Sequence, residues 1–171
     1  HSIDEINQAW GKLNEYERTL LERLLFLLRE ALQVENLLKR FYSKCDQQDA
    51  WKEARIDPLA EDFSKITYFQ LSPLKSKTVE ITNEIESRDS RITFIANLKH
   101  KLSDLNCKEM DAVNMRYDKV LDGMKVLKEA LQLYKKRIEE REKILIELDT
   151  KKKEYSQIAS EIRAYLENCT E

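Results

Sequence analysis

An apolar stripe at heptad spacing runs through the last third of the chain. Starting at Met110, alternating steps of three and four residues meet Val113, Tyr117, Val120, Met124, Leu127, Leu131, Tyr134, Ile138, Leu145, Leu148, Tyr155, Ala159, Ile162, Leu166 and Cys169. Only Arg141 and Lys152 break the stripe. Such spacing keeps side chains on one helix face and is typical of a coiled-coil seam. The pattern predicts a single helix over 108–169, roughly 90 Å long.

A second stripe opens the chain. Steps of four and three give Ile6, Trp10, Leu13, Glu17, Leu20, Leu24, Leu27, Ala31, Val34, Leu38, Phe41, Cys45 and Gln48, which predicts a helix from residue 3 to about 55. Between residues 20 and 28 the apolar face widens to include Leu21, Leu25, Phe26 and Leu28. A wide face indicates contacts on two sides, as in a bundle of three or more helices.

Two Asp/Ser-Pro pairs mark the segment that follows. Asp57-Pro58 ends the first helix and opens a short one, with aspartate as cap and proline at the first helical position. We interpret 58–71 as a short helix and loop that close one end of the bundle. Ser72-Pro73 repeats the cap signal.

A middle helix is predicted over 73–105. Asn106 with Glu109 three residues later forms a variant of the capping box and starts the last helix. The fold class is therefore all-α, an up-down-up three-helix bundle with short connections. Its predicted core includes Leu24, Phe41, Trp51, Ile81, Ile92, Tyr117, Leu127 and Tyr134.

The middle helix, near 50 Å, is too short to cover its neighbours of about 78 and 90 Å. We therefore expect three parts: a helix end at 3–21, a repeat at 22–141, and a helix projecting over 142–171. Each apolar side chain that is fully buried contributes about 1.5–3 kcal/mol, so the projecting stripes should pair with another chain. The predicted contacts are Ile6, Trp10, Leu13, Leu145, Leu148, Tyr155, Ile158, Ile162 and Leu166.

Composition supports long helices and excludes several classes of function. Charged residues make up 36%, with only two glycines and two prolines. The net charge of −2 comes from interspersed charges, so neither nucleic acid nor an anionic membrane is an expected partner. No 18-residue apolar stretch and no signal peptide is found. Because the chain begins and ends within helical pattern, we expect a fragment of a longer protein.

No motif for catalysis or for a cofactor is found. The two histidines lie far apart in sequence, and neither a Gly-rich phosphate loop nor an H-E-x-x-H motif is present. The three cysteines, Cys45, Cys107 and Cys169, are interpreted as reduced thiols of a cytoplasmic protein. We expect no metal, no cofactor and no enzymatic activity.

Two short motifs carry a family resemblance. Residues 6–13, INQAWGKL, followed by Leu37, Phe41, Lys44, Cys45 and Trp51, resemble the spectrin-repeat rod of α-actinins, with cysteine where alanine is usual. The resemblance implies a spectrin-repeat-like bundle whose first helix continues from a preceding repeat. It also implies a cytoskeletal role, since α-actinins are antiparallel homodimers that cross-link actin filaments. Their actin-binding calponin-homology domains and EF-hand domains lie outside these residues.

Two other interpretations of the sequence remain open. Spectrin, dystrophin and plakin segments use the same repeat as a monomeric spacer within one chain. A membrane-binding helical dimer of the BAR type also uses long three-helix units, but it needs a surplus of lysine and arginine on its concave face, which this chain lacks.

Overall fold

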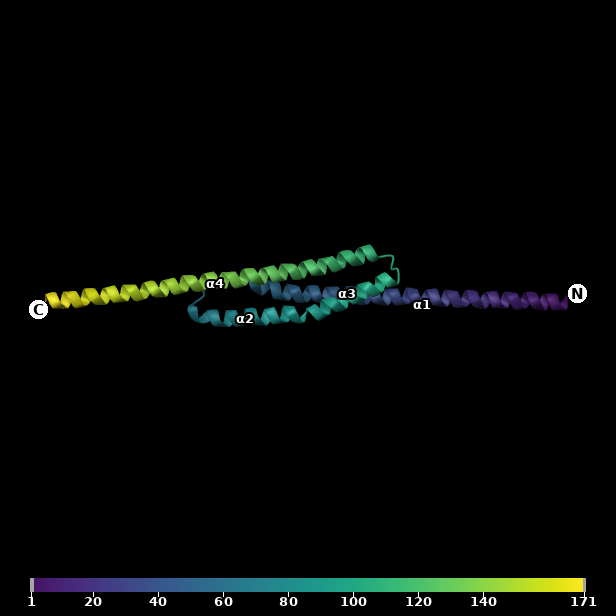
Figure 1. The fold of residues 1–171 in the computed structure, drawn as a ribbon, viewed down its shortest axis with the longest axis horizontal. Helices are drawn as coiled ribbons and strands as arrows, with labels where there is room; N and C mark the ends of the chain where they lie inside the picture. The colour runs from purple at the N-terminus through teal and green to yellow at the C-terminus, as the bar shows by residue number, and fades with distance from the viewer. Residues whose placement is uncertain (1, 171) are drawn as a thin grey trace. The chain divides into compact units, whose positions relative to one another are not determined.

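The computed structural model describes residues 2–170, which are helical except for short connections. In chain order the elements are α1 (Ile3–Ile56), the 3₁₀ helix η1 (Asp57–Ala60), α2 (Tyr68–Ser87), α3 (Asp89–Asp104) and α4 (Met110–Cys169) (Figure 1). The first and last predicted helices are thus confirmed to within two residues at either end. No strand occurs in the described part of the chain.

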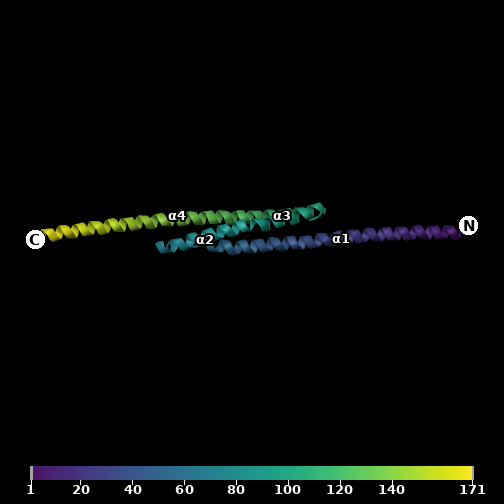
Figure 2. The ribbon, with the colours of Figure 1, turned by 60° about the horizontal axis from the view of Figure 1, so that its bottom comes forward.

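The chain divides into two compact units. Unit 1 contains α1 up to Gln48 and the segment Arg91–Val120, which holds most of α3 and the start of α4. Unit 2 contains the segment Asp49–Ser90, with η1 and α2, and the chain from Leu121 onward. Each unit contains segments of three helices that pack around its own core, and the predicted all-α three-helix packing is confirmed. The elements that supply these segments can be followed in Figures 1 and 2.

The core of unit 1 forms where α1, α3 and the start of α4 meet. Its buried members are Phe41, Cys45, Ile95, Leu98, Leu102, Cys107, Val113 and Val120. Phe41 also contacts Tyr42 edge-to-face, with ring centroids 5.4 Å apart. Burial raises the pKa of the Tyr42 phenol, and the charge of Glu109 adds to the shift.

Unit 2 builds its core between α2, the 57–67 connection and α4. The buried apolar residues are Leu59, Phe63, Leu71, Ile81, Ile85, Met124, Leu127, Leu131, Tyr134 and Ile138. Phe63 packs edge-to-face on Tyr134 at 5.0 Å between centroids, which anchors the connection on α4. Burial raises the pKa of the Tyr134 phenol, and the Glu61 carboxylate adds to the shift.

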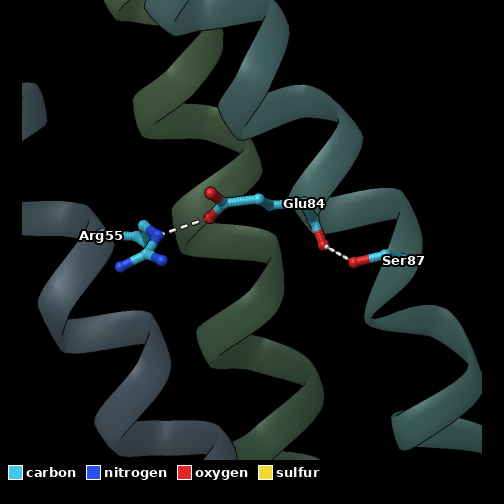
Figure 3. A network of polar contacts seen from close by, with 3 residues as sticks. All are labelled: Arg55, Glu84 and Ser87. Atoms are coloured by element: carbon cyan, nitrogen blue, oxygen red, sulfur yellow. Dashed lines mark hydrogen bonds and ion pairs between the residues drawn. The ribbon is translucent and has the colours of Figure 1, made fainter.

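The predicted middle helix is in fact two helices that break at Arg88. The Ser87 hydroxyl donates to the Glu84 carbonyl at 2.7 Å (Figure 3). The Ser90 hydroxyl donates to the Ser87 carbonyl at 3.2 Å. Such side-chain bonds to the preceding turn bend helices. The Arg88 N–H is shared between the Glu84 and Ile85 carbonyls, as in a 3₁₀ turn.

Two contacts hold the helix break at Arg88 in place. The Arg88 guanidinium lies over the Trp51 ring, 4.4 Å from its centroid. On the same part of α1, the Arg55 Nε donates to a Glu84 carboxylate oxygen at 2.5 Å (Figure 3). Trp51, predicted as a core residue, is therefore a half-buried platform for cationic side chains.

The start of α2 also differs from the expectation. Ser72-Pro73 does not cap a helix, because α2 already begins at Tyr68 and includes Pro73. The cap is Thr67, whose N–H donates to Gln70 Oε1 at 2.9 Å as in a capping box. Before it, η1 has Ile56 rather than Asp57 at its N-cap position.

The turn before α4 is built differently from the predicted capping box. Asn106 is not an N-cap but closes α3, with a left-handed φ of 53°. Its N–H donates to Ser103 O at 3.0 Å, and the Cys107 N–H donates to Leu102 O at 3.1 Å. These two bonds define a Schellman motif, in which asparagine tolerates the left-handed position and Cys107 and Leu102 supply the apolar contact.

The residues that we predicted as core fall into three groups. Phe41, Ile81, Leu127 and Tyr134 are buried, whereas Trp51, Ile92 and Tyr117 are partly buried. Leu24 differs from the expectation, because its side chain is 55% exposed. Within unit 1 no other helix lies beside this part of α1 (Figures 1 and 2), so nothing in the unit covers it.

Candidate functional site

The N-terminal part of α1 carries a long exposed apolar surface. Every residue from 2 to 29 is exposed, although the heptad stripe continues through this stretch. The predicted contacts Ile6, Trp10 and Leu13 are 52%, 59% and 46% exposed. The other large apolar side chains exposed here are Ile3, Tyr16, Leu20, Leu21, Leu24, Leu25, Phe26, Leu27 and Leu28. An apolar surface of this length marks a contact site for another molecule.

The C-terminal part of α4 repeats this arrangement in unit 2. Residues 146–170 are all exposed, and along most of this stretch α4 extends past the other helices of unit 2 (Figures 1 and 2). The predicted contact residues Leu148, Tyr155, Ile158, Ile162 and Leu166 lie in this stretch, and Leu145 just before it is half-buried. The two sets of predicted contacts thus lie in different units of the chain.

A shallow groove lies where the exposed stretch of α4 begins. It has a volume of about 390 Å³ and is lined by Tyr68, Phe69, Leu145, Ile146, Leu148, Asp149 and Lys152. Phe69, in the first turn of α2, is 89% exposed. Tyr68 and Phe69 contact each other edge-to-face at 6.4 Å between centroids, so the groove has an aromatic wall.

Two arginines of α4 hold the connection that places this aromatic wall. Arg141, one of the two breaks in the apolar stripe, donates to the Ile66 carbonyl from Nη2 at 3.2 Å. One turn earlier, Arg137 donates to the carbonyls of Leu59 and Glu61. The Arg137 guanidinium also lies 4.7 Å from the centroid of the Phe63 ring. The two arginines therefore supply side-chain donors to three carbonyls of the connection at the end of unit 2.

Sequence reasoning missed the aromatic wall and the full length of the α1 surface. The Thr67-x-x-Gln70 pattern is itself a capping-box signal and would have placed Phe69 in a first helical turn. Because Leu71 of that turn is buried, a residue two positions earlier lies on the opposite side of the helix. The widened face at 20–28 was visible in the sequence, but it was interpreted as packing within one chain.

Neither a cluster of possible metal ligands nor a helix that could span a membrane is found in the described residues. Within 2–170, no three His, Cys, Asp or Glu side chains come together as metal ligands. In the same range, no helix contains an apolar stretch long enough to span a bilayer. None of the three cysteines forms a disulfide; Cys45 and Cys107 are buried, and Cys169 is exposed.

Comparison with known proteins extends the resemblance beyond the first 50 residues. No protein-family model matches the chain. Human alpha-actinin-1 is 25% identical over 170 residues, which cover 99% of this chain and 19% of that protein. Chicken alpha-actinin-4 gives the same values, and bovine alpha-actinin-3 is 23% identical over the same extent. The chain is thus similar to α-actinins from end to end, and it spans about a fifth of their length.

Proposed function

We propose that this chain is a structural rod segment that pairs with a second copy of itself in antiparallel orientation. The observation that carries the proposal is the pair of exposed apolar stretches, 2–29 in α1 and 146–170 in α4, which nothing in the single chain covers. In an antiparallel pair, each stretch of one copy lies beside the other stretch of the second copy. A two-fold interface of this kind is isologous and closes at the dimer.

The contacts of this interface are those expected from the sequence, extended by the exposed residues 22–29. On α1 they include Ile6, Trp10 and Leu13, and Leu24 joins them as an exposed residue of the same stripe. On α4 they include Leu145, Leu148, Tyr155, Ile158, Ile162 and Leu166. The division into 3–21, 22–141 and 142–171 remains part of the proposal, and residue 171 lies outside the described residues.

The proposed biological role is to hold actin-binding domains apart in a cytoskeletal cross-linker of the cytoplasm. This role rests on the end-to-end similarity to alpha-actinins. As stated in the sequence analysis, members of that family are dimers that cross-link actin filaments. Actin would bind through domains outside these residues, so the partner of this chain is a second copy of itself. The contribution of the rod is geometric: it requires no catalysis, cofactor, nucleic acid or membrane.

Fluorescence resonance energy transfer between labelled copies tests whether the two chains pair in antiparallel orientation. Cys169 is the only exposed thiol among the described residues, because Cys45 and Cys107 are buried. One batch carries a donor on Cys169; a second carries an acceptor on Asn7→Cys in a Cys169→Ser background. An antiparallel pair brings these two positions together, so mixing should give strong transfer. Donor and acceptor both on Cys169 should give little.

The other outcomes identify the competing functions. A parallel dimer would reverse the two results, with strong transfer between Cys169 labels. A monomeric spacer would give no transfer in either mixture. Liposome co-sedimentation at low salt covers the membrane-binding alternative, because strong binding by the isolated chain would favour a BAR-type function.

A further inference from the structure

We infer that the groove formed by Tyr68 and Phe69 with α4 receives the Leu20–Leu28 run of α1 from a second copy. The inference rests on the antiparallel dimer proposed above and assigns to its interface a part of α2 that the heptad stripes do not include. The occupant is a defined segment of this same chain.

The lengths of the two exposed stretches set the register. The α1 stretch covers residues 2–29 and the α4 stretch covers 146–170, so they contain 28 and 25 residues. Full antiparallel overlap places 29 near 146 and 2 near 170. Paired residue numbers therefore sum to 172–175. In this register Leu148 lies opposite residues 24–27, which are the centre of the Leu20–Leu28 run.

The width of the apolar face on α1 also favours contact between the Leu20–Leu28 run and the groove. Leu20, Leu21, Leu24, Leu25, Phe26, Leu27 and Leu28 are all exposed, so they surround much more of α1 than a single stripe. One partner helix covers a narrow seam, and a wider face needs two neighbours. Along its exposed stretch, α4 is joined by a second element of unit 2 only at the groove, where Tyr68 and Phe69 supply the second wall.

The charges at the groove agree with this register. Its two charged lining residues are Asp149 and Lys152. The same sums place Lys152 opposite residues 20–23, which include both Glu22 and Arg23, and Asp149 opposite 23–26, of which Arg23 alone is charged. Arg23 therefore falls within one helical turn of Asp149, and Glu22 falls within one helical turn of Lys152. Such pairs favour one register over shifted ones more than they add to affinity.

Disulfide trapping between two variants tests the inference. Both variants carry Cys169→Ser, which removes the exposed native thiol. One also carries Phe69→Cys, and its partner carries Leu24→Cys or Leu28→Cys. After mixing and mild oxidation, a non-reducing gel should show a product of twice 20.4 kDa in at least one mixture. All three replaced side chains are exposed in the single chain, so folding of each copy should be unchanged.

A matched mixture provides the control. Leu13→Cys is on the same helix and also exposed, but the register places it opposite residues 159–162, about three turns or more from Leu148 in the groove. Phe69→Cys should not cross-link to it. Cross-linking to Leu13→Cys, or to neither position while light scattering still reports a dimer, would overturn the groove inference and leave the dimer standing. A monomeric mass for the mixture would overturn both.

Discussion

Replacing Ile162 with glutamate is expected to turn the proposed dimer into a monomer without unfolding the chain. Ile162 is 54% exposed in the single chain, so a polar side chain there should leave the intrachain packing intact. In the dimer its burial contributes about 1.5–3 kcal/mol, and the two-fold axis counts it twice. A loss of about 3–6 kcal/mol corresponds to a rise in the dissociation constant of roughly 10²–10⁴-fold. Light scattering at micromolar concentration would report this change.

Ser160→Glu is the matched control for the Ile162 variant. Ser160 is exposed on the same helix, but two residues correspond to about 200° of rotation, so its side chain points away from the stripe. The control adds the same charge and should remain dimeric. If the Ile162→Glu variant kept the mass of the unmodified chain, the α4 stripe could not be the interface.

Truncating Phe41 to alanine should produce the largest loss of stability within a single chain. Phe41 is fully buried, and it lies in the unit 1 core with Ile95, Leu98 and Val113. Removing a buried phenyl ring costs about 3–5 kcal/mol through lost burial and the cavity that remains. Urea denaturation followed by circular dichroism would measure the change in the free energy of unfolding. The concentration must be the same for both proteins, because dimerisation adds to apparent stability.

Met115→Ala is the matched control for Phe41→Ala, because it also truncates a large apolar side chain. Met115 lies on α4 of the same unit but is 74% exposed. Its truncation leaves no cavity, so the free energy of unfolding should change by less than about 0.5 kcal/mol. Equal losses in the two variants would mean that unit 1 is not packed around Phe41.

The two long helices could be predicted because their signal is repeated many times. Each heptad of α1 and α4 adds apolar residues to one face. Neither helix contains a proline, and each contains a single glycine. Arg141 could be recognised as a break in the stripe. Its function could not, because the carbonyl of Ile66 that it contacts reaches α4 only in the folded connection.

The ends of the shorter helices could not be predicted because they depend on single hydrogen bonds. A serine hydroxyl that bends a helix at Arg88 looks, in sequence, like any serine on a solvated face. Asn106 fits both an N-cap and a left-handed C-terminal position, and only its φ decides between them. At Ser72-Pro73, the preference of proline for the first turn of a helix indicated a helix start. The helix in fact begins earlier, directly after the capping residue Thr67.

The candidate interface was predicted in kind but not in extent. A heptad stripe has the same appearance whether its partner lies in the same chain or in another. Leu24 therefore looked like a core residue until its exposure was known. Phe69 lies outside every stripe, and only the position of the first turn of α2 beside Leu148 makes it part of a surface.

The mass of the unmodified chain in solution is the most direct test of the account. Sedimentation equilibrium across a range of concentrations should give a species of twice 20.4 kDa that dissociates on dilution. A well-folded species of 20.4 kDa at every concentration would contradict the account, because both apolar stretches would then be stable in water without a partner.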